Sequence, residues 1–526
     1  MRCIGLKRDR YRIERICTKM SKFKTAAIFS SGMVLQREKP VIIFGEGENA
    51  AEVKAEIDGL TASARVKDGK WRILLPAHKA GNDYTLKLTC GDEEKTFTNV
   101  AYGEVWLAGG QSNMELELQN CAEKDALTSD LNPNVRFYYT QKKAIKEKDF
   151  FTCEENTGWS EFNSESAKCW SAVGYFFARE LAEKLGVTVG VIGCNWGGTS
   201  ASYWMSREAL EKDSDTNEYL LDIEKTTAGK TDEQIEKEWY EYCDYLEQWN
   251  KKSAEFYEKN PGGTWDECQA YAGVSRYPGP PCEYNPMSAT VLYKSMLQRV
   301  CPYTLKGFIY YQGESDDHRP KTYFKLFREL IQLWRNDWGD DSLPFLFVQL
   351  PMHRYKADPD WKHWCIIREA QMKVFDTVKN TGICVALDKG EFDEIHPKQK
   401  LPIGHRLALQ ALYGVYGFEN LKEEAFSPMY KSYELKDGGM ELSFNHCRGF
   451  KTEEEVTGFE IAGEDKEFKP AEPQFKGDRI FISSPEVKEP LYGRYNWTNY
   501  GEVTVFGVNG LPLAPFRTSV NDEKES

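Results

Sequence analysis

The sequence predicts an α/β protein in which a central domain with a parallel sheet is flanked by a β-rich domain at each end. Strand-like apolar runs alternate with helical patterns over residues 101–205 and 283–418, as they do in parallel sheets covered by helices on both faces. Residues 25–100 alternate apolar and polar side chains with a period of two, and residues 425–518 return to strands and turns. Apolar residues make up 41% of the 526-residue chain, enough to bury a large core.

A basic leader precedes these domains. Residues 1–24 contain nine Lys or Arg against Asp9 and Glu14, although the whole chain carries a net charge of −14. A secretory signal would continue into an apolar stretch, and none follows here. We therefore expect residues 1–24 to be disordered, with Met20 as an alternative start, and we expect a cytoplasmic protein.

The N-terminal β domain is expected over residues 25–100. The run 41–44 is apolar, and the segments 51–57 and 84–88 alternate. Residues 45–50 loosely match a dinucleotide-binding fingerprint, but that motif needs a helix after the glycine loop. A strand-like segment follows instead, so we predict a hairpin turn.

The central domain is expected over residues 101–424. A helix should begin at Ser171 and end at Gly186, because glycine is a common helix C-cap. The remaining patterns predict strands near 104–108, 187–192, 307–311, 345–350 and 383–387, and helices near 322–338, 364–378 and 401–413.

Residues 206–282 interrupt this alternation and predict a helical insertion. Thr231 and Gln234 form a capping-box pattern, and apolar or aromatic residues then recur at spacings of three and four from Ile235 to Trp249. We expect that stripe to pack on the core; an insertion near a catalytic face could also act as a lid. The C-terminal β domain, 425–526, contains the alternating segment 440–444.

Composition excludes several classes of function. The acidic balance disfavours a nucleic-acid binder, because phosphate contacts need clustered Lys and Arg. No run approaches the roughly 20 apolar residues of a membrane helix. The 14 cysteines include no C-x-x-C pair, so zinc-ribbon spacing is absent. Without a secretory signal we expect most of them to be reduced, buried thiols. We expect no metal site and no cofactor.

Two glycine-rich loops follow predicted strands, where ligands gather in open α/β sheets. Ser112 lies in the loop 109–114, but the nucleophile elbow of α/β-hydrolases needs a glycine two residues later, where Met114 stands. Ser112 is therefore a nucleophile or a helix N-cap. Gly197 and Gly198 could direct N–H groups at an oxyanion or form an ordinary turn.

Two further loops carry polar side chains. Gln312 could donate to an oxyanion and Glu314 could orient a histidine, or both could cap the next segment. Asp393 and His396 are spaced to meet within one turn, as a catalytic pair or as a surface pair. Together the four loops favour acyl transfer by a serine nucleophile.

At these residues the chain resembles the SGNH (GDSL-like) hydrolases, and within them the sialate O-acetylesterases and related carbohydrate acetylesterases. The motifs are VWLAGGQSNMEL, VIGCNWGGTSASYW, KGFIYYQGESD and DEIHPKQKLPIGHRLA, in the family's order. The likeness extends from about residue 29 to 518. It implies the three-layer α/β/α SGNH fold with a parallel sheet for the central domain.

The resemblance also implies site residues. Ser112 would be the nucleophile and His396 the general base. The oxyanion hole would use the Ser112 N–H, Gly197 or Gly198, and the Gln312 side chain. For the acid that orients His396, relatives differ, and we rank Asp393 first, Glu314 second and Glu394 third. Gln111, Trp196 and Tyr311 stand beside the motifs, and we expect them to contact the substrate.

The function expected is hydrolysis of O-acetyl esters on sugars, either acetylated sialic acid or acetylated xylo- or manno-oligosaccharides. No nucleic acid, membrane or cofactor is involved in this reading, and the oligomeric state is open. Three alternatives remain: a general short-chain esterase, a glycoside hydrolase that uses Glu314 and Asp393 as paired carboxylates, and a non-catalytic carbohydrate-binding protein.

Overall fold

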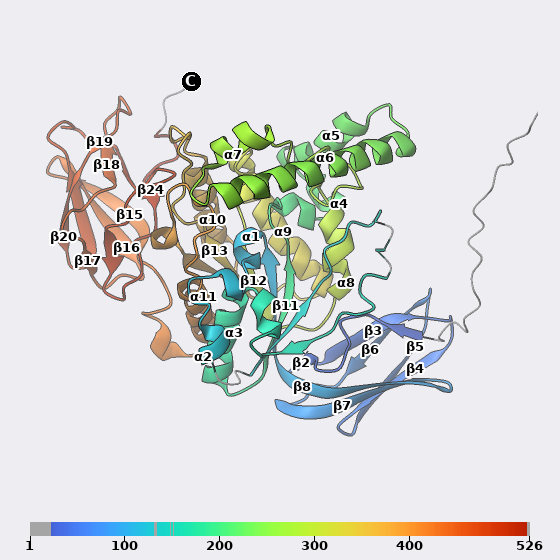
Figure 1. Ribbon diagram of the computed structural model, residues 1–526. Coiled ribbons are helices and arrows are strands. Elements are labelled where there is room, and N and C mark those ends of the chain that lie inside the picture. Colours follow the sequence, from blue (N-terminus) through green and yellow to red (C-terminus); the bar gives the residue numbers. More distant parts are fainter. Residues whose placement is uncertain (1–22, 131–133, 148, 151, 523–526) are drawn as a thin grey trace, which may run out of the picture.

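The computed structural model describes residues 23–130, 134–147, 149–150 and 152–522. It is a mixed α/β structure with strand-rich regions at both ends of the chain (Figure 1). The expected leader, apart from Phe23 and Lys24, lies outside the described residues. No helix in the described part of the chain is long and apolar enough to cross a membrane.

The N-terminal strands form two antiparallel groups. One is the three-stranded sheet β1-β3-β6; the other joins β5, β4 and β7 to the first part of β8. The strands are β1 (Phe23–Thr25), β2 (Val34–Gln36), β3 (Val41–Gly47), β4 (Glu52–Ile57), β5 (Leu60–Arg65), β6 (Lys70–Leu75), β7 (Gly81–Cys90) and β8 (Glu93–Gly110). The hairpin predicted at residues 45–50 is wrong, because β3 and β4 belong to different sheets and this turn connects them.

The central sheet begins where the N-terminal sheet ends, because β8 belongs to both and runs across the expected domain boundary at residue 100. Its order is β10-β9-β11-β8-β12-β13-β14, parallel except for the edge strand β10. The further strands are β9 (Val135–Tyr139), β10 (Ser160–Glu161), β11 (Val189–Asn195), β12 (Gly307–Tyr311), β13 (Phe345–Gln349) and β14 (Thr381–Val385). The chain extends the sheet on one side of β8 and then on the other, so β8 lies at the topological switch point.

Helices cover both faces of this sheet. Trp106 of β8 contacts Phe177 of α3 (Ala172–Leu185), whereas a Cβ at Gly109 would meet Trp334 of α9 (Tyr323–Trp338). Because side chains alternate along a strand, α3 and α9 lie on opposite faces. The helix α11 (Leu401–Gly414) packs on α3, and α10 (His363–Thr377) packs on α9.

These helices agree with the sequence signals at their ends. Ser171 caps α3 by accepting from the Gly174 N–H, and Gly186 ends it with a left-handed φ of 65°. Such a conformation costs glycine little, which explains the stop. The shorter helices here are α1 (Ser112–Glu115), α2 (Ala126–Ser129) and α8 (Gln298–Val300).

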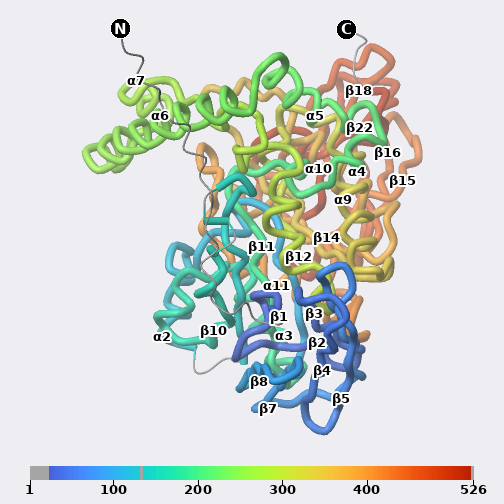
Figure 2. The backbone as a smooth tube through the Cα atoms, turned by 90° about the vertical axis from the view of Figure 1, so that its right-hand side faces the viewer, coloured from blue at the N-terminus to red at the C-terminus, as the bar shows by residue number. Residues whose placement is uncertain are grey.

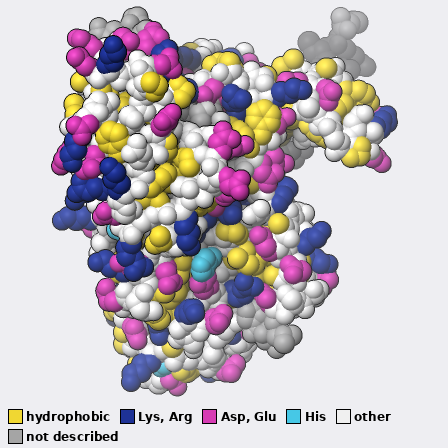
Figure 3. Space-filling model, turned by 90° about the vertical axis from the view of Figure 1, so that its left-hand side faces the viewer, with side chains coloured by type: hydrophobic (Ala, Val, Ile, Leu, Met, Phe, Trp, Pro, Cys, Tyr) yellow, Lys and Arg dark blue, Asp and Glu magenta, His cyan; other side chains and the backbone are white. Residues whose placement is uncertain are grey.

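The insertion is helical, as predicted. It contains α4 (Arg207–Leu210), α5 (Ser214–Thr227), α6 (Asp232–Lys259) and α7 (Trp265–Ala272), and the capping box at Thr231 and Gln234 is present. Trp249 and Phe256 of α6 pack with Cys268 of α7 in a small apolar cluster of their own. Trp249, the last residue of the predicted stripe, thus packs against α7 rather than in the main core. In Figure 2 the α6–α7 arm projects from the body, and in Figure 3 the surface is hollowed beneath it.

The C-terminal strands surround a separate apolar cluster that includes Leu442, Ile461 and Tyr495. The strands are β15 (Met429–Lys436), β16 (Gly439–Asn445), β17 (Phe450–Thr452), β18 (Phe459–Ala462), β19 (Lys469–Pro470), β20 (Glu472–Lys476), β21 (Arg479–Ser483), β22 (Tyr492–Tyr495), β23 (Val505–Gly507) and β24 (Phe516–Arg517). The alternation at residues 440–444 is confirmed as part of β16.

The described cysteines are free thiols, and seven of the twelve are buried. This agrees with reduced thiols that pack as small hydrophobic residues.

Candidate active site

Ser112 lies directly beyond the carboxyl end of β8, at the switch point of the sheet. Gly110 turns the chain there with a φ of 128°, and a Cβ on it would collide with the carbonyl oxygen of Tyr311. Only glycine therefore fits between the strand and the serine. Ser112 is the first residue of α1, so no acceptor within that helix is available to its N–H.

His396 reaches Ser112 from the loop before α11. Its Nε2 lies 2.8 Å from Ser112 Oγ, although the two residues are 284 positions apart. This distance is within hydrogen-bond reach for proton transfer between a nucleophile and a base. Burial lowers the pKa of His396 below its usual value, and the Glu394 carboxylate acts in the opposite direction. The imidazole is therefore neutral at pH 7 and able to accept a proton.

The acid beside His396 is Glu394, not Asp393. Glu394 Oε1 lies 3.7 Å from His396 Nδ1 and accepts a hydrogen bond from the His396 backbone N–H at 2.7 Å. Asp393 has a left-handed φ of 60°, and its carboxylate accepts from the Lys356 N–H instead. We expected Asp393 to meet the imidazole. The left-handed turn at Asp393 instead directs its carboxylate to Lys356, and the carboxylate of Glu394 lies beside His396.

Glu314 is buried, and among the described residues it forms no ion pair with His396. Its Oε1 accepts from Asn113 Nδ2 at 2.6 Å, and the same Nδ2 donates to the Ile395 carbonyl at 2.9 Å. Lys400 Nζ donates to Asn113 Oδ1 at 2.6 Å. Burial raises the pKa of Glu314 and lowers that of Lys400 to about 7. We call Asn113, Glu314 and Lys400 the buried network; it ties the residue after Ser112 to the residue before His396.

The glycine block adjoins the serine from the end of β11. A Cβ on Gly197 would lie 3.3 Å from Ser112 Cβ. The Gly197 N–H donates to Glu115 Oε2 at 2.5 Å, and the other Glu115 oxygen pairs with Lys142. The expected oxyanion donor is thus close to the nucleophile but engaged by a carboxylate that sequence reasoning missed.

Gly198 is held by the insertion. Its φ is 73°, and a Cβ on it would collide with the Tyr277 hydroxyl, which donates to the Gly198 carbonyl at 2.8 Å. The helical insertion therefore reaches the glycine block through Tyr277. Trp196, expected to contact substrate, is partly buried, and its backbone N–H donates to the Gly110 carbonyl at 3.2 Å.

Gln312 is engaged by the residues around it. Its Nε2 donates to Asp316 Oδ2 at 2.7 Å and to the Thr199 carbonyl at 3.1 Å, and its Oε1 accepts from Tyr323. The side chain is 1% exposed. The expected oxyanion role of Gln312 stays a prediction, and both polar atoms of its amide are engaged by the framework. Asp316 also accepts from Ser200, which joins the Gln block to the glycine block.

Gln111 and Tyr311, expected to contact substrate, also belong to the framework. Gln111 Oε1 accepts from Gln312 Nε2 and from the Ser315 N–H, each at 3.2 Å. Tyr311 is 1% exposed and lies under the Lys400 ammonium, 5.3 Å from the ring centre. Substrate contact by these two residues stays a prediction, and both side chains are buried. Asn113, Glu115, Asp316 and Lys400 were missed although all four lie inside the four motifs, and their charge or amide groups were the only signal.

No group of metal-ligating side chains occurs within the described ranges. His405, which we interpreted as a helix residue, lies in α11 and pairs with Glu180.

Comparisons with known proteins point in one direction. Residues 281–413 match the family model for the carbohydrate esterase, sialic acid-specific acetylesterase. The chain is similar to the sialate O-acetylesterase of Mus musculus, with 27% identity over 80% of this chain and 79% of that protein. It is similar to the sialate O-acetylesterase of Homo sapiens, with 25% identity over 78% of this chain and 74% of that protein.

Among solved structures, the chain is similar to a novel carbohydrate acetylesterase from Xanthomonas citri. The TM-score is 0.75 at 27% identity, and the match covers 95% of this chain and 100% of the other. The likeness therefore includes both strand-rich ends as well as the central sheet.

Proposed function

Since the chain is a carboxylic-ester hydrolase of the sialate O-acetylesterase and carbohydrate acetylesterase family, we propose that it removes O-acetyl groups from sugars through an acyl-enzyme on Ser112. The observation that carries this proposal is the 2.8 Å contact between Ser112 Oγ and His396 Nε2. It joins a hydroxyl at the end of a strand to a neutral imidazole on another loop, as acyl transfer requires.

The reaction follows from that contact. His396 Nε2 takes the Ser112 proton as Oγ attacks the acetyl carbonyl, and the imidazolium then protonates the sugar oxygen as the ester bond breaks. Water attacks the acetyl-enzyme with His396 again as base, and acetate leaves. Nδ1 must carry a proton during these steps, and Glu394 lies on that side of the ring. Glu394 would therefore favour this tautomer and stabilise the imidazolium.

The oxyanion needs donors close to Ser112. The Ser112 N–H and the Gly197 N–H are the candidates, because both adjoin the nucleophile. For Gly197 to act, the Glu115 carboxylate has to release its N–H. A negatively charged oxyanion competes for the same donor, and repulsion between the two anions favours this release. We leave Gln312 out of the oxyanion hole.

The finer fold assignment is part of the same proposal. The strand order β11-β8-β12-β13-β14, with helices on both faces and the serine after β8, supports an SGNH-type three-layer domain over about residues 101–424. The strand order alone gives no support to a glycoside hydrolase or a carbohydrate-binding protein. The contact between Ser112 and His396 favours an esterase over both of these alternatives.

The substrate class is an O-acetylated carbohydrate. Acetylated sialic acid is the first candidate, because the family model and the curated relatives carry that specificity in their names. Acetylated xylo- or manno-oligosaccharides are the second, supported by the broader name of the carbohydrate acetylesterase from Xanthomonas citri.

The test is acetate release by the purified full-length protein. The panel contains O-acetylated sialic acid, acetylated xylo- and manno-oligosaccharides, and p-nitrophenyl esters of increasing acyl length. Release from one sugar class that Ser112→Ala abolishes would support the proposal. Equal activity on long acyl esters would replace it with a general esterase. Undiminished release by Ser112→Ala would refute the mechanism.

A further inference from the structure

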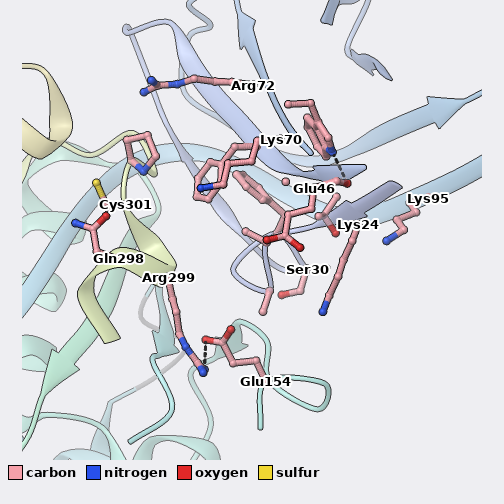
Figure 4. Close-up of a pocket in the computed structure, with 18 of the residues that line it drawn as sticks. Lys24, Ser30, Glu46, Lys70, Arg72, Lys95, Glu154, Gln298, Arg299 and Cys301 are labelled. Carbon is pink, nitrogen blue, oxygen red and sulfur yellow. Dashed lines mark hydrogen bonds and ion pairs between the residues drawn. The ribbon is translucent and has the colours of Figure 1, made fainter. Parts of the chain in front are cut away.

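A large cavity lies away from the candidate active site, against the sheet β1-β3-β6. It has a volume of about 990 Å³, near the upper end of the roughly 300–1,000 Å³ that is usual for small-molecule sites. Its other walls come from residues 154–157 and 298–302 (Figure 4). Lys95, which also lines it, lies near the start of β8, and Ser112 follows the other end of that strand. Lys95 and Ser112 are 17 residues apart, which at about 3.3 Å per residue allows a separation of up to about 56 Å.

The sheet presents a charged face to this cavity because of its register. Lys24, Glu46 and Lys70 are directly paired across β1, β3 and β6, so their side chains share one face. Phe44 and Arg72 form the next pair on the same face. Ile43, Trp71 and Ile73 alternate with these residues along β3 and β6 and are buried in the core, although Trp71 also lines the cavity. Figure 4 shows Lys24, Glu46 and Lys70 projecting on the side of Arg299 and Glu154.

Cations outnumber acids around the cavity. Seven Lys or Arg side chains line it against three Glu, in a chain that is otherwise strongly acidic. Among the described residues, Lys24, Lys70 and Arg72 have no carboxylate within ion-pair distance. Burial lowers the pKa of Lys95, and the nearby positive charge of Lys24 lowers it further. A bound anion would relieve the repulsion between these two charges.

The opposite wall is ordered by its own contacts. Arg299 is 12% exposed, lies over the Phe150 ring at 4.1 Å and donates to the Phe150 carbonyl at 2.6 Å. One of its nitrogens lies 3.3 Å from Glu154 Oε1. The guanidinium is thus fixed at the cavity edge, and Gln298, Ser30 and Thr157 add neutral polar groups to the lining. Polar groups of both kinds around an apolar floor at Phe44 and Ala26 suit a ligand that carries hydroxyls as well as charge.

We propose that this cavity binds a carboxylate-bearing saccharide, as a second carbohydrate site remote from Ser112. Its role would be to hold an acidic glycan while the esterase site acts on another part of it or on a neighbouring chain. That role rests on the proposed function, but the binding does not. A nucleic acid is less suited to the cavity, because Trp71 and Phe29 are buried and the partly buried Phe44 is a single ring, whereas strand binding uses successive rings for base stacking.

The test is calorimetric titration of the Ser112→Ala protein, which cannot turn substrate over, with sialyllactose and with lactose as its neutral counterpart. We expect binding of sialyllactose that weakens with added salt, and at least ten-fold weaker binding of lactose. The triple variant Lys24→Gln, Lys70→Gln, Arg72→Gln should lose at least ten-fold in affinity for sialyllactose. A matched control, Lys54→Gln, Lys124→Gln, Lys431→Gln, removes three exposed lysines outside the cavity lining and should bind like the parent.

Several results would overturn the inference. They are equal affinity for sialyllactose and lactose, equal affinity in the triple variant and its control, or no binding at millimolar ligand. Displacement of sialyllactose by equimolar inorganic phosphate would replace the saccharide site by a simple anion site. Thermal melting of each variant verifies folding. With Ser112 intact, the same triple variant should release acetate from a monosaccharide substrate at a rate within two-fold of the parent. The binding proposal and the esterase proposal can therefore fail independently of each other.

Discussion

Replacing Glu394 by Gln tests which acid serves His396. The substitution keeps the size of the side chain and an oxygen that can accept from the His396 N–H, but it removes the charge 3.7 Å from Nδ1. Asp393→Asn and Glu314→Gln are the matched controls. They neutralise the two acids that sequence reasoning ranked higher.

The size of the effect follows from distance and exposure. Two unit charges 3.7 Å apart interact by about 1 kcal/mol in water and about 4 kcal/mol at an effective dielectric of 20. The Glu394 and His396 side chains are 42% and 39% exposed. Solvent screening therefore places the interaction near the lower value, at about 1–2 kcal/mol. We expect kcat/KM to fall about 5–30-fold, far less than the roughly 10⁴-fold of a buried triad aspartate.

The pH profile provides an independent readout. The base must be neutral, so kcat/KM rises with pH through the pKa of His396. Burial lowers that pKa and Glu394 raises it, so Glu394→Gln should move the acid limb to lower pH while it lowers the plateau. Steady-state kinetics from pH 4.5 to 9 on O-acetylated sialic acid measure both effects. A larger loss in Asp393→Asn than in Glu394→Gln, or no shift of the limb, would refute this assignment.

Three further predictions concern the surroundings of the site. Burial lowers the pKa of Lys400 to about 7 from 10.5, so the folded state binds fewer protons than the unfolded state between those values. Unfolding free energy should therefore rise with pH over this window, by up to about 5 kcal/mol. In urea titrations at pH 7 and 9.5, Lys400→Met should remove most of this increase in unfolding free energy, whereas Lys398→Met, at an exposed position, should retain it. An equal increase in the two variants would contradict the burial argument. Gln312→Ala should lower the melting temperature along with turnover, because it removes the hydrogen bonds of the Gln312 amide to Asp316 and Tyr323. Lost turnover with an unchanged melting temperature would restore Gln312 as an oxyanion donor. Tyr277→Phe should lower kcat/KM about three- to ten-fold by freeing Gly198, at a cost of about 0.5–1.5 kcal/mol in hydrogen bonding. Tyr245→Phe loses a hydrogen bond to the Val274 carbonyl elsewhere in the insertion and should not reduce kcat/KM. An equal reduction of kcat/KM in both variants would show that the Tyr277 hydroxyl has no specific effect on the site.

Local signals were enough to predict most of the central helices and strands. Ser171 and Gly186 mark the two ends of α3 because capping depends on a few neighbouring residues. Pairing between strands was not readable in the same way. The turn after Gly45 looks like a hairpin in sequence, but β3 pairs with β1 and β6, and that choice depends on residues more than 20 positions away. The two-residue strand β10 is too short to leave a pattern.

The candidate site shows the same contrast between features that local motifs predict and features that depend on packing. Motif order identified Ser112 and His396, and the structure brings them within hydrogen-bond distance. The choice among acids required the backbone of a single turn, because aspartate adopts a positive φ more often than most residues but the sequence does not say which aspartates do so, and the φ of 60° at Asp393 is known only from the structure. The orientation of the Gln312 amide depends on Asp316 and Tyr323, and only the packed structure shows that these two groups use it.

The buried network gives a positioning role to motif residues that take no part in the proposed proton transfer. The serine block contributes Asn113, the Gln block Glu314 and the His block Lys400, and the three meet behind Ser112. Burying a lysine and a glutamate is unfavourable for stability, as the lowered pKa of one and the raised pKa of the other show. What the network supplies is position. Asn113 fixes the chain next to Ser112, and its bond to the Ile395 carbonyl fixes the chain next to His396. Since the catalytic contact spans two loops, a small relative shift would break it, and a rigid polar tie opposes that shift.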